Sequence, residues 1–503
     1  MRIKPDFEPF AAKYRQGRPQ VVWTRTVADL ETPVSAMLKL SRDAPNNFLL
    51  ESVEGGAVRG RYSIIGLKPD IIWRASGETA EINRQALGGG TFSPCPEPTL
   101  DALRALLDES AIELAEELPP MAAGVFGYMG YDTVRLMEEL PHPNPDVLGF
   151  PDALFIRPTI IAIFDAVKDE ITIVTPVRPT AGVSDKVAYS RAVDRLAETM
   201  ETLERPLVAP PAPADLDAIA EPQSNTEPSE YLAMVARAKA YIEAGDIFQV
   251  VLSQRFSTPF ELPAFSLYRA LRRVNPSPFL YHLNFGDFAL TGSSPEILVR
   301  VRDGEVTIRP IAGTRPRGTT PAEDRALAKS LLEDPKELAE HLMLLDLGRN
   351  DVGRVATVGT IEVTDRFFLE YYSHVMHIVS NVVGRLDPAH DAIDALAAGF
   401  PAGTVSGAPK VRAMEIIDEL EKEKRGIYAG CVGYFSANGD MDTCIVLRTA
   451  IVSKGQIFVQ AGAGIVADSV PESELAECHA KARALFRAAD EAVRFASQAR
   501  RGQ

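Results

Sequence analysis

A stretch rich in proline and polar residues, close to the middle of the chain, limits how the chain can fold. Residues 207–215 read Leu-Val-Ala-Pro-Pro-Ala-Pro-Ala-Asp, and residues 221–228 read Glu-Pro-Gln-Ser-Asn-Thr-Glu-Pro. Proline has no backbone N–H and disrupts helices and sheets, so such a stretch is typical of a surface connection. We therefore predict one region over residues 20–205, a connection over residues 206–228 and a second region over residues 229–497.

Periodicity in the two regions predicts both strands and helices. In the first region, strand-like runs cover residues 21–27 and 154–164, and the second run turns at residues 167–169 into residues 171–174, which predicts a β-hairpin. In the second region, helical patterns alternate with strand patterns. The helical patterns cover residues 231–244, 335–347 and 471–495, and the strand patterns cover residues 288–290, 306–308 and 457–460. The predicted fold class is therefore α+β, with mixed or antiparallel sheets.

The net charge and the cysteine spacing argue against several classes of protein. A net charge of -16, with no stripe of Lys and Arg, disfavours a nucleic-acid partner. The N-terminus lacks the apolar segment of a signal peptide, and no apolar run approaches the ~20 residues of a membrane span. Cys95, Cys431, Cys444 and Cys478 lack the spacing of a zinc site, and four reduced thiols are expected. We therefore predict a cytoplasmic protein without a membrane partner.

Two pairs of glutamates stand three residues apart, each near a predicted helix start. Glu337 and Glu340 follow an Asp-Pro start, and Glu474 and Glu477 follow a Ser-Val-Pro start, so each pair lies on one helix face. Acids in a first helical turn are commonly solvated and are favoured by the helix dipole. If the two helices faced each other, however, the crowded carboxylates would require protons or a hard divalent cation such as Mg²⁺. The spacing alone leaves both interpretations open.

Three loops place small residues beside hydroxyl groups and cations, and such loops can aim backbone N–H groups at an anion. They cover residues 311–317, 401–410 and 460–465. The second lacks the spacing of a nucleotide-binding P-loop, and the third lacks the last glycine of a dinucleotide fingerprint. Three other residues have structural interpretations as well as functional ones. His377 lies among apolar residues, which is typical of a buried structural histidine, and Tyr428 and Arg448 could form a cross-strand structural pair.

These segments, taken in order, resemble the chorismate-utilising enzymes. The match covers about residues 231–485. It is carried by the sequences at residues 310–318, 340–351 and 460–466. The resemblance implies this family's fold, a two-lobed arrangement of β-sandwich and mixed sheets flanked by helices, with residues 229–497 as the chorismate-binding catalytic domain.

The same resemblance implies a Mg²⁺ cofactor and a substrate site. Glu340 and Glu477 match the principal Mg²⁺ ligands, with Glu337 and Glu474 beside them. The positions that match residues holding chorismate are Gly313, Thr314, Tyr428, Arg448, Gly462, Ala463 and Gly464. Arg448 would face the enolpyruvyl carboxylate, which suits a planar guanidinium.

Three further positions match catalytic residues of the family. Glu296 matches the general acid that protonates the departing C4 hydroxyl, and His377 with Thr404 matches the pair that serves the elimination of pyruvate. Hydroxide is a poor leaving group without a proton donor, and an elimination needs a base near C2, so each role is chemically reasonable.

Two positions distinguish the reactions that this family catalyses. Aminodeoxychorismate synthases use a lysine nucleophile where this chain has Ala312, and a methyl group cannot attack. Isochorismate and salicylate synthases use a lysine base where this chain has Gln249. The resemblance therefore implies amination of chorismate at C2, followed by loss of pyruvate to give anthranilate. An aminodeoxychorismate synthase and a non-catalytic tryptophan-binding sensor are the alternatives.

A regulatory site with elements in the first region is also implied. Residues 49–52, Leu-Leu-Glu-Ser, resemble the family's feedback site for tryptophan, although a plain strand end is the alternative. The matching positions are Glu51, Ser52, Pro278, Phe279, Leu280, Val432, Tyr434 and Cys444. Phe279 and Leu280 replace the Tyr-Met pair of some members, which bears on the affinity for the inhibitor.

The chain lacks a recognisable glutaminase module. No cysteine lies in a small-residue nucleophile elbow followed by a His and Glu pair. We therefore predict that ammonia comes from a separate glutamine amidotransferase subunit, with free ammonium as a poorer donor.

Overall fold

The computed structural model describes all residues except 43, 55–57, 208–218, 373–374 and 499–503. Residues 208–218 of the predicted connection therefore lie outside the described residues. The helices are α1 (Phe7–Arg15), α2 (Pro33–Ser41), α3 (Thr99–Ser110), α4 (Asp185–Glu204), α5 (Pro228–Glu243), α6 (Ala264–Val274), α7 (Pro321–Leu332), α8 (Pro335–Gly353), α9 (Ala392–Gly399), α10 (Lys410–Leu420) and α11 (Pro471–Gln498), with the 3₁₀ helices η1 (Ala86–Gly88), η2 (Pro120–Ala122) and η3 (Tyr131–Leu136). The strands are β1 (Ile3–Lys4), β2 (Gln20–Val27), β3 (Asn47–Glu54), β4 (Val58–Ser76), β5 (Thr79–Asn83), β6 (Ser93–Pro94), β7 (Gly124–Met129), β8 (Ala153–Asp165), β9 (Glu170–Val177), β10 (Gln223–Ser224), β11 (Gln249–Pro259), β12 (Phe279–Asn284), β13 (Phe288–Ser294), β14 (Ile297–Arg302), β15 (Glu305–Ile308), β16 (Ile311–Pro316), β17 (Glu362–Tyr371), β18 (Val375–Arg385), β19 (Gly407–Ala408), β20 (Cys431–Ser436), β21 (Met441–Ile445), β22 (Thr449–Ser453) and β23 (Gln456–Ile465).

Strands from the two sides of the predicted connection pair with each other. β3 lies between β4 and β12, and β7 lies between β8 and β20. From β12 the pairing continues through β13, β22 and β23 to β11. From β20 it continues through β21, β14 and β15 to β18. All these pairs are antiparallel, which confirms the α+β prediction in its antiparallel form.

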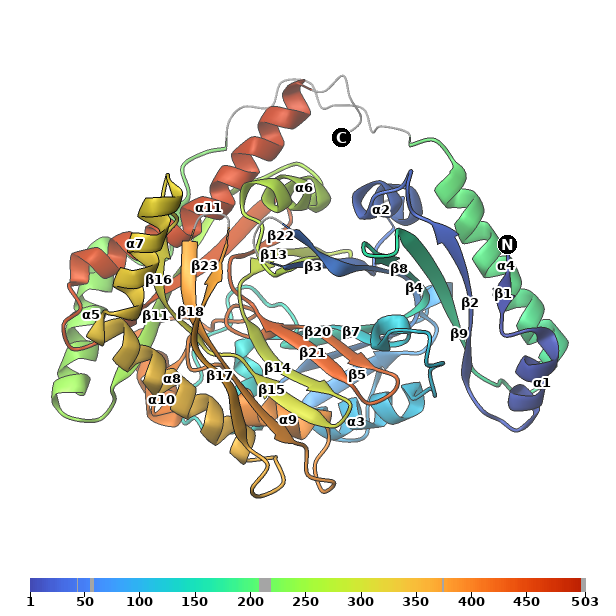
Figure 1. Ribbon diagram of the computed structural model, residues 1–503, viewed down its shortest axis with the longest axis horizontal. Coiled ribbons are helices and arrows are strands. Elements are labelled where there is room, and N and C mark those ends of the chain that lie inside the picture. Colours follow the sequence, from blue (N-terminus) through green and yellow to red (C-terminus); the bar gives the residue numbers. More distant parts are fainter. Residues whose placement is uncertain (43, 55–57, 208–218, 373–374, 499–503) are drawn as a thin grey trace.

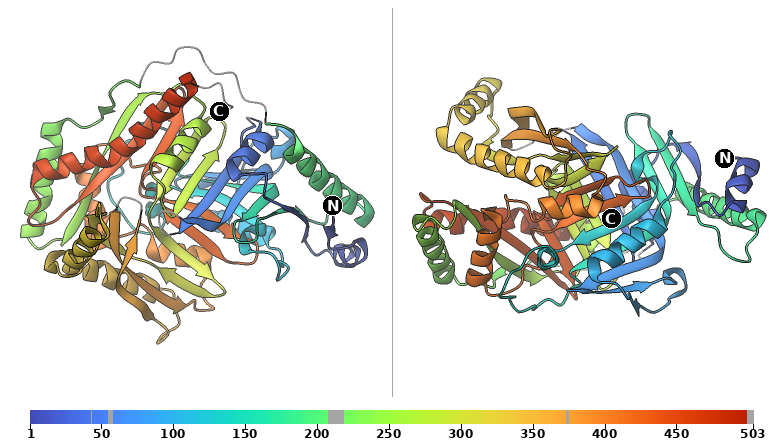
Figure 2. Two further views of the ribbon diagram at one scale, coloured as in Figure 1. Left: turned by 45° about the horizontal axis from the view of Figure 1, so that its top comes forward. Right: turned by 90° about the horizontal axis from the view of Figure 1, so that it is seen from below.

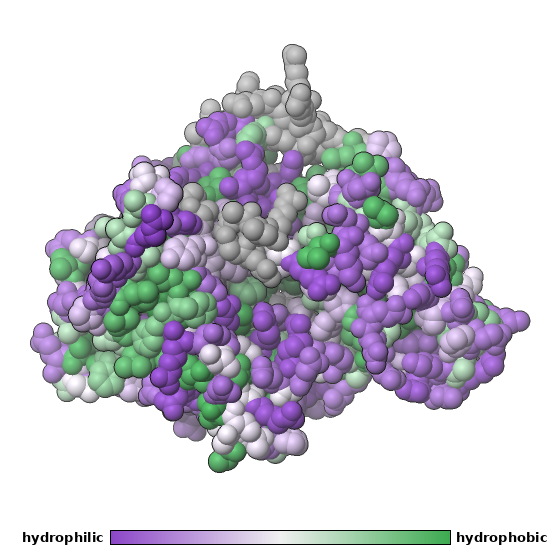
Figure 3. All heavy atoms as spheres, viewed as in Figure 1, coloured by the Kyte–Doolittle hydropathy of each residue, from purple (hydrophilic) through white to green (hydrophobic). Residues whose placement is uncertain are grey.

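The views of the whole molecule show where these elements lie. In Figure 1, α1, β2, β9 and α4 lie on one side, and α5, α7, α8 and α10 lie on the other, while β7, β20 and β21 cross the middle. The right-hand view of Figure 2 shows the α7–α8 pair set apart from α5 and α10 at the same end of the molecule. The face in Figure 3 is mainly hydrophilic, with an apolar area at its left over the region of α8 and β18.

Local sequence signals account for the elements nearest this end. The Asp334 side chain accepts hydrogen bonds from the backbone N–H groups of Lys336 and Glu337, and Pro335 occupies the first turn, so α8 begins where predicted. The predicted second helix start is also confirmed, because α11 begins at Pro471. β8 and β9 form the predicted hairpin.

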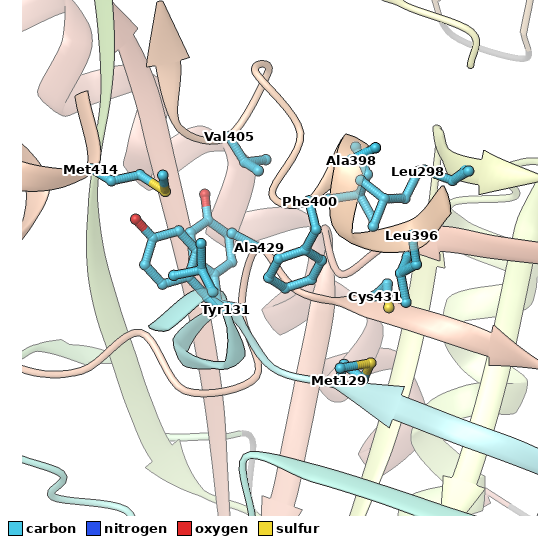
Figure 4. Close-up of a cluster of buried hydrophobic side chains, with 14 of the residues drawn as sticks. Met129, Tyr131, Leu298, Leu396, Ala398, Phe400, Val405, Met414, Ala429 and Cys431 are labelled. Carbon is cyan, nitrogen blue, oxygen red and sulfur yellow. The ribbon is translucent and has the colours of Figure 1, made fainter. Parts of the chain in front are cut away.

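One apolar cluster joins the two sides of the chain. Trp73 and Met129 from the first region pack in it with Phe400 and Cys431 from the second. Figure 4 shows part of this cluster, including Met129, Phe400 and Cys431. All four cysteines are free thiols, as predicted. Within the described ranges, no helix is long and apolar enough to cross a membrane.

Candidate active site

One cavity of about 640 Å³ is lined by all the predicted catalytic, substrate and metal-ligand residues except Ala463. Its wall includes β11, β16, β18 and β23, parts of α8 and α11, and the loops that carry Glu296, Thr404, Tyr428 and Arg448. Small-molecule sites typically measure ~300–1,000 Å³. The structure therefore gathers residues spread over much of the chain into a space suited to a small substrate.

Glu296 is the buried acid of this cavity. It lies in the loop between β13 and β14, is 6% exposed, and accepts a hydrogen bond at Oε2 from Thr404 Oγ1 at 3.1 Å. Burial disfavours the charged form and raises the pKa of Glu296 to about 8, although the bond from Thr404 acts in the opposite direction. The carboxyl group is therefore protonated at neutral pH, as a general acid must be.

His377 is a neutral histidine that lines this cavity. It lies on β18 opposite Thr314 on β16, and its Nδ1 is 3.0 Å from Thr314 Oγ1 and 3.3 Å from the carbonyl oxygen of Gly313. A carbonyl oxygen only accepts, so this bonding assigns the proton to Nδ1 and leaves Nε2 able to take one. Burial, and then the charge of Arg448, lower the pKa of His377 to about 4.

Each of these two residues has a threonine hydroxyl group as a hydrogen-bond partner. Thr404 bonds to Glu296, and Thr314 bonds to His377. Thr314 and His377 are direct cross-strand neighbours, while Thr404 lies in the turn after α9. Two hydrogen-bonded pairs, one around the acid and one around the base, therefore line the cavity.

Arg448 supplies a cation to the cavity. It lies between β21 and β22 with φ +48°, a left-handed conformation that residues other than glycine rarely adopt. Burial lowers the pKa of its guanidinium, and no acid of the described chain forms an ion pair with it. A half-buried guanidinium of this kind fits a carboxylate of the substrate.

Tyr428 and Gly313 occupy special positions in the wall. Tyr428 lies in the turn before β20 rather than in the strand expected there, and it is buried beside Arg425, whose guanidinium lies 5.7 Å from its ring centre. Burial raises the pKa of the Tyr428 hydroxyl above its ordinary value. Gly313 has φ +74°, so a side chain there would strain the backbone, and a Cβ would lie 3.1 Å from the Glu337 carboxylate.

β23 turns its glycines toward the cavity and Ala463 toward the core. Gly462 and Gly464 line the cavity, while Ala463 is fully buried in the apolar cluster described above. Successive residues of a strand point to opposite faces, so the Ala463 side chain cannot contact a substrate here. A Cβ at Gly464 would lie 2.6 Å from Gln249 Nε2, which shows how closely this wall approaches β11.

The glutamates of α8 and α11 meet across the cavity. Burial and the charges of Glu337 and Glu477 raise the pKa of Glu340, with nearby lysines acting in the opposite direction. Burial and the charge of Glu477 also raise the pKa of Glu474. Glu340 and Glu477, on different helices, therefore repel each other across the cavity that both line.

Two cations among these acids were not assigned from the sequence. Arg315 Nη1 forms an ion pair with Glu337 Oε1 at 2.7 Å. Lys481 Nζ forms an ion pair with Glu477 Oε1 at 2.7 Å and donates a hydrogen bond to the carbonyl oxygen of Gly462 at 2.8 Å. Lys481 stands four residues after Glu477, a spacing that a helix brings together and that could have indicated the pair. No comparable local signal marks Arg315, because its partner lies on another element.

The donor set fits a Mg²⁺ ion completed by substrate rather than a closed protein cage. Among the residues with described positions, no three His, Cys, Asp or Glu side chains converge closely enough to hold an ion. Mg²⁺ usually takes one or two carboxylates together with water and substrate oxygens. Glu340 forms no ion pair with any described residue and is crowded by other carboxylates, so it is the acid best suited to a cation.

The two positions that distinguish reactions within the family both line this cavity. Ala312 is on β16 and Gln249 begins β11. Gln249 is 4% exposed, and its Oε1 has no hydrogen-bond partner in the described structure. Neither side chain can act as a covalent nucleophile or as a base that activates water.

The predicted tryptophan-site residues lie outside this cavity, on paired strands and beside them. Ser52 pairs with Phe279, Glu51 with Leu280, and Val432 with Cys444, while Pro278 directly precedes β12. Phe279, Val432, Tyr434 and Cys444 pack into one apolar cluster. The structure thus brings four of these eight predicted residues into one cluster.

Glu51 and Leu280 point to the other face of the same strands. Leu280 packs there with Tyr268 of α6, and Glu51 accepts hydrogen bonds from Arg272 at 2.6 and 3.0 Å. Strand alternation explains the division, because neighbouring residues face opposite ways. The Glu51 carboxylate is therefore engaged by α6.

A known protein family matches most of this chain. A family model described as chorismate binding enzyme matches residues 59–487. Anthranilate synthase component 1 of Cereibacter sphaeroides is 56% identical over 500 residues, which cover 99% of each chain. The chain belongs to the chorismate binding enzyme family, and within it to the anthranilate synthase component 1 group.

Solved structures agree with this assignment. The crystal structure of anthranilate synthase component I from Streptococcus pneumoniae matches with a TM-score of 0.74 at 36% identity, covering 92% of this chain and 99% of that chain. The menaquinone-specific isochorismate synthase of Escherichia coli matches with a TM-score of 0.70, covering 96% of this chain and 98% of that chain. Its identity is 21%, so this second likeness concerns the fold alone.

Proposed function

We propose that this chain catalyses the Mg²⁺-dependent conversion of chorismate and ammonia to anthranilate and pyruvate, the first committed step of tryptophan biosynthesis. The observation that carries the proposal is one cavity in which a protonated Glu296, a neutral His377, the Arg448 cation and the glutamates of two helices meet. The similarity to proteins named anthranilate synthase component 1 supports it.

The geometry supports a two-step reaction. Ammonia adds at C2, both ring double bonds shift, and the C4 hydroxyl takes the Glu296 proton and leaves as water; the new ammonium group then gives up one proton, which restores the protonated carboxyl group. His377 Nε2 next takes the proton from C2, the C3–O bond breaks, and the ring becomes aromatic. Pyruvate leaves as its enolate and takes up a proton at its methylene carbon. Arg448 binds the enolpyruvyl carboxylate throughout. Mg²⁺ bound at Glu340 and Glu477 would hold a substrate carboxylate and offset the charge of the glutamates.

A direct assay tests this proposal. The purified chain is incubated with chorismate, ammonium and Mg²⁺, and anthranilate is followed by fluorescence and pyruvate by a coupled assay. We expect both products in equal amounts. Accumulation of 4-amino-4-deoxychorismate would favour an aminodeoxychorismate synthase, and unchanged chorismate together with tryptophan binding would favour a non-catalytic sensor.

A variant tests the metal assignment within the same assay. Glu340→Gln keeps the volume of the side chain but removes the charge that a hard cation requires, so Mg²⁺-dependent turnover should be lost while the fold persists. Glu472→Gln, an exposed acid in the first turn of α11 outside the cavity, is the matched control and should behave as wild type. Wild-type turnover by Glu340→Gln would overturn the assignment.

We also propose a glutamine amidotransferase partner, feedback inhibition by tryptophan and a cytoplasmic location. The component numbering in the relatives' names supports a partner, and the packing of Phe279, Val432, Tyr434 and Cys444 supports a shared regulatory region. The chain alone should use ammonium but not glutamine, and tryptophan should lower its rate. Equal use of glutamine and ammonium by the chain alone would refute the partner.

A further inference from the structure

A buried ion pair lies directly behind the cavity wall. Arg425 is 3% exposed and Glu421 is 6% exposed. Arg425 Nε donates to Glu421 Oε2 at 2.9 Å, and its Nη2 donates to Glu421 Oε1 at 2.6 Å. Neither residue lines the cavity, so the pair does not contact a substrate.

The pair joins two separate parts of the cavity wall. The Arg425 guanidinium also donates from Nη1 to the carbonyl oxygen of Val405 at 2.7 Å and from Nη2 to that of Val251 at 2.6 Å. Val405 and Val251 both line the cavity, and Val405 directly follows Thr404. Glu421 in turn accepts from the backbone N–H and the hydroxyl group of Ser253 at 2.8 and 2.9 Å. The pair therefore ties the Thr404 segment to β11.

Aromatic rings fix the guanidinium from other sides. Its carbon lies 4.8 Å from the ring centre of Tyr131 and 5.7 Å from that of Tyr428, which lines the cavity. Figure 4 shows Tyr131, Val405 and Ala429 close together in the apolar cluster. Three chain segments, those of β11, Val405 and Tyr428, thus converge on one side chain.

Stability alone does not account for such an arrangement. Desolvation largely offsets the attraction within a buried ion pair, so the pair contributes little net free energy of folding compared with apolar side chains. The planar fork of an arginine, however, defines the direction of each hydrogen bond that it donates. The Arg425–Glu421 pair therefore specifies the position of the Val405 segment relative to β11.

We propose that Glu421 and Arg425 are positioning residues for the buried acid, because they fix the Val405 carbonyl group and so keep Thr404 Oγ1 within hydrogen-bonding distance of Glu296. This inference rests on the proposed function of Glu296 as general acid. A matched control exists nearby, since Arg135 binds Asp418 of α10 at 2.6 Å but donates to the carbonyl oxygen of Leu140, which does not line the cavity.

The test compares Arg425→Lys with Arg135→Lys in the anthranilate assay. Lysine keeps the charge but loses the fork, so we expect kcat of Arg425→Lys to fall about 10- to 100-fold, as misplaced catalytic groups commonly cause. The pH profile of kcat, measured at constant free ammonia, should also change. Its alkaline limb should move to higher pH, because the Glu296 carboxylate loses the hydrogen bond that stabilises it.

Two further measurements distinguish positioning from a general loss of structure. Thr404→Val should move the alkaline limb in the same direction. The double variant, Thr404→Val with Arg425→Lys, should move the limb no further, because both changes remove the same hydrogen bond from Thr404 to Glu296. Arg135→Lys should leave kcat and the limb at their wild-type values. Folding is checked by near-ultraviolet circular dichroism, and Glu421→Gln replaces Arg425→Lys if the latter does not fold.

The outcomes separate this inference from the proposed function. If wild-type protein forms no anthranilate, the proposed function fails before any variant is compared. If wild-type protein is active but folded Arg425→Lys keeps the wild-type alkaline limb, or shifts it additively with Thr404→Val, the positioning role is wrong.

Discussion

At the scale of single residues, burial sets the protonation of the acid and the base in opposite directions. It raises the pKa of Glu296 to about 8 and lowers that of His377 to about 4, because each group loses stability in its charged form. Between these values Glu296 holds a proton to donate and His377 can accept one. Both residues are therefore in their reactive forms over the same range of pH.

The raised pKa of Glu296 predicts how the rate depends on pH. With free ammonia held constant, kcat should fall as pH rises through about 8, because Glu296 then loses the proton that it must donate. Because the pKa of Glu296 in the folded protein is raised to about 8, its protonated form, which is the active one, is present below about pH 8. A profile that stays flat well above pH 8 would contradict this role.

The Glu296→Gln variant tests the same group by substitution. Glutamine cannot donate a carboxyl proton, so the rate should fall by about 10²- to 10⁴-fold, the usual contribution of a general acid. Chorismate binding, measured by calorimetry, should persist because Arg448 remains. Glu305→Gln, at an exposed end of β15, is the control and should keep the wild-type rate.

At the scale of elements, the first turn of α8 holds the acids in place through its cap. Asp334 accepts hydrogen bonds from the N–H groups of Lys336 and Glu337, and it also binds Arg315 at 2.7 Å. Asp334→Ala should lower the free energy of unfolding by roughly 1 kcal/mol, as the loss of an N-cap commonly does. Denaturant unfolding measures the change.

Two matched variants separate the cap from a general effect of charge. Asp334→Asn retains an acceptor oxygen for the backbone and should lose much less stability than Asp334→Ala. Asp346→Ala removes an exposed acid of the same helix that pairs with Arg349 and should cost little. Equal losses for all three variants would show that the cap is not what stabilises this turn.

Elements with local signals could be predicted from the sequence, and contacts between distant segments could not. The start of α8 follows from Asp-Pro, and the β8–β9 hairpin follows from the turn at residues 167–169. The bond from Thr404 to Glu296 spans 108 residues, and no periodicity encodes it. The resemblance supplied both residues but not the bond between them, because similarity of motifs carries no distances.

At the scale of the whole molecule, the order of strands ties the two sides of the chain together. The proline-rich stretch predicts a connection between two regions, and strands of the two regions pair, β3 with β12 and β7 with β20. Strand pairing is set by tertiary contacts that alternation along one segment cannot specify. The apolar cluster that includes Trp73 and Phe400 also ties the two sides of the chain together, because each region supplies only part of its side chains.

This interleaving predicts that the two sides fold only together. Expressed alone, residues 1–207 should show no cooperative thermal transition, because β3 and β7 would present unpaired edges and the shared cluster would be exposed. Residues 219–503 alone should behave in the same way. Co-expressed, the two fragments should assemble, melt cooperatively and form anthranilate, since the cut falls in the connection and breaks none of these strand pairs.

The control is the intact chain with a protease site placed within residues 208–218. Cleavage after folding should leave both the melting transition and the activity in place, because the paired strands already hold the fragments together. Circular dichroism and the fluorescence assay report the two properties. A fragment of residues 219–503 that melts cooperatively and converts chorismate by itself would show that β12 and β20 do not need their partners from the first region, and that the strand network is not the unit that folds.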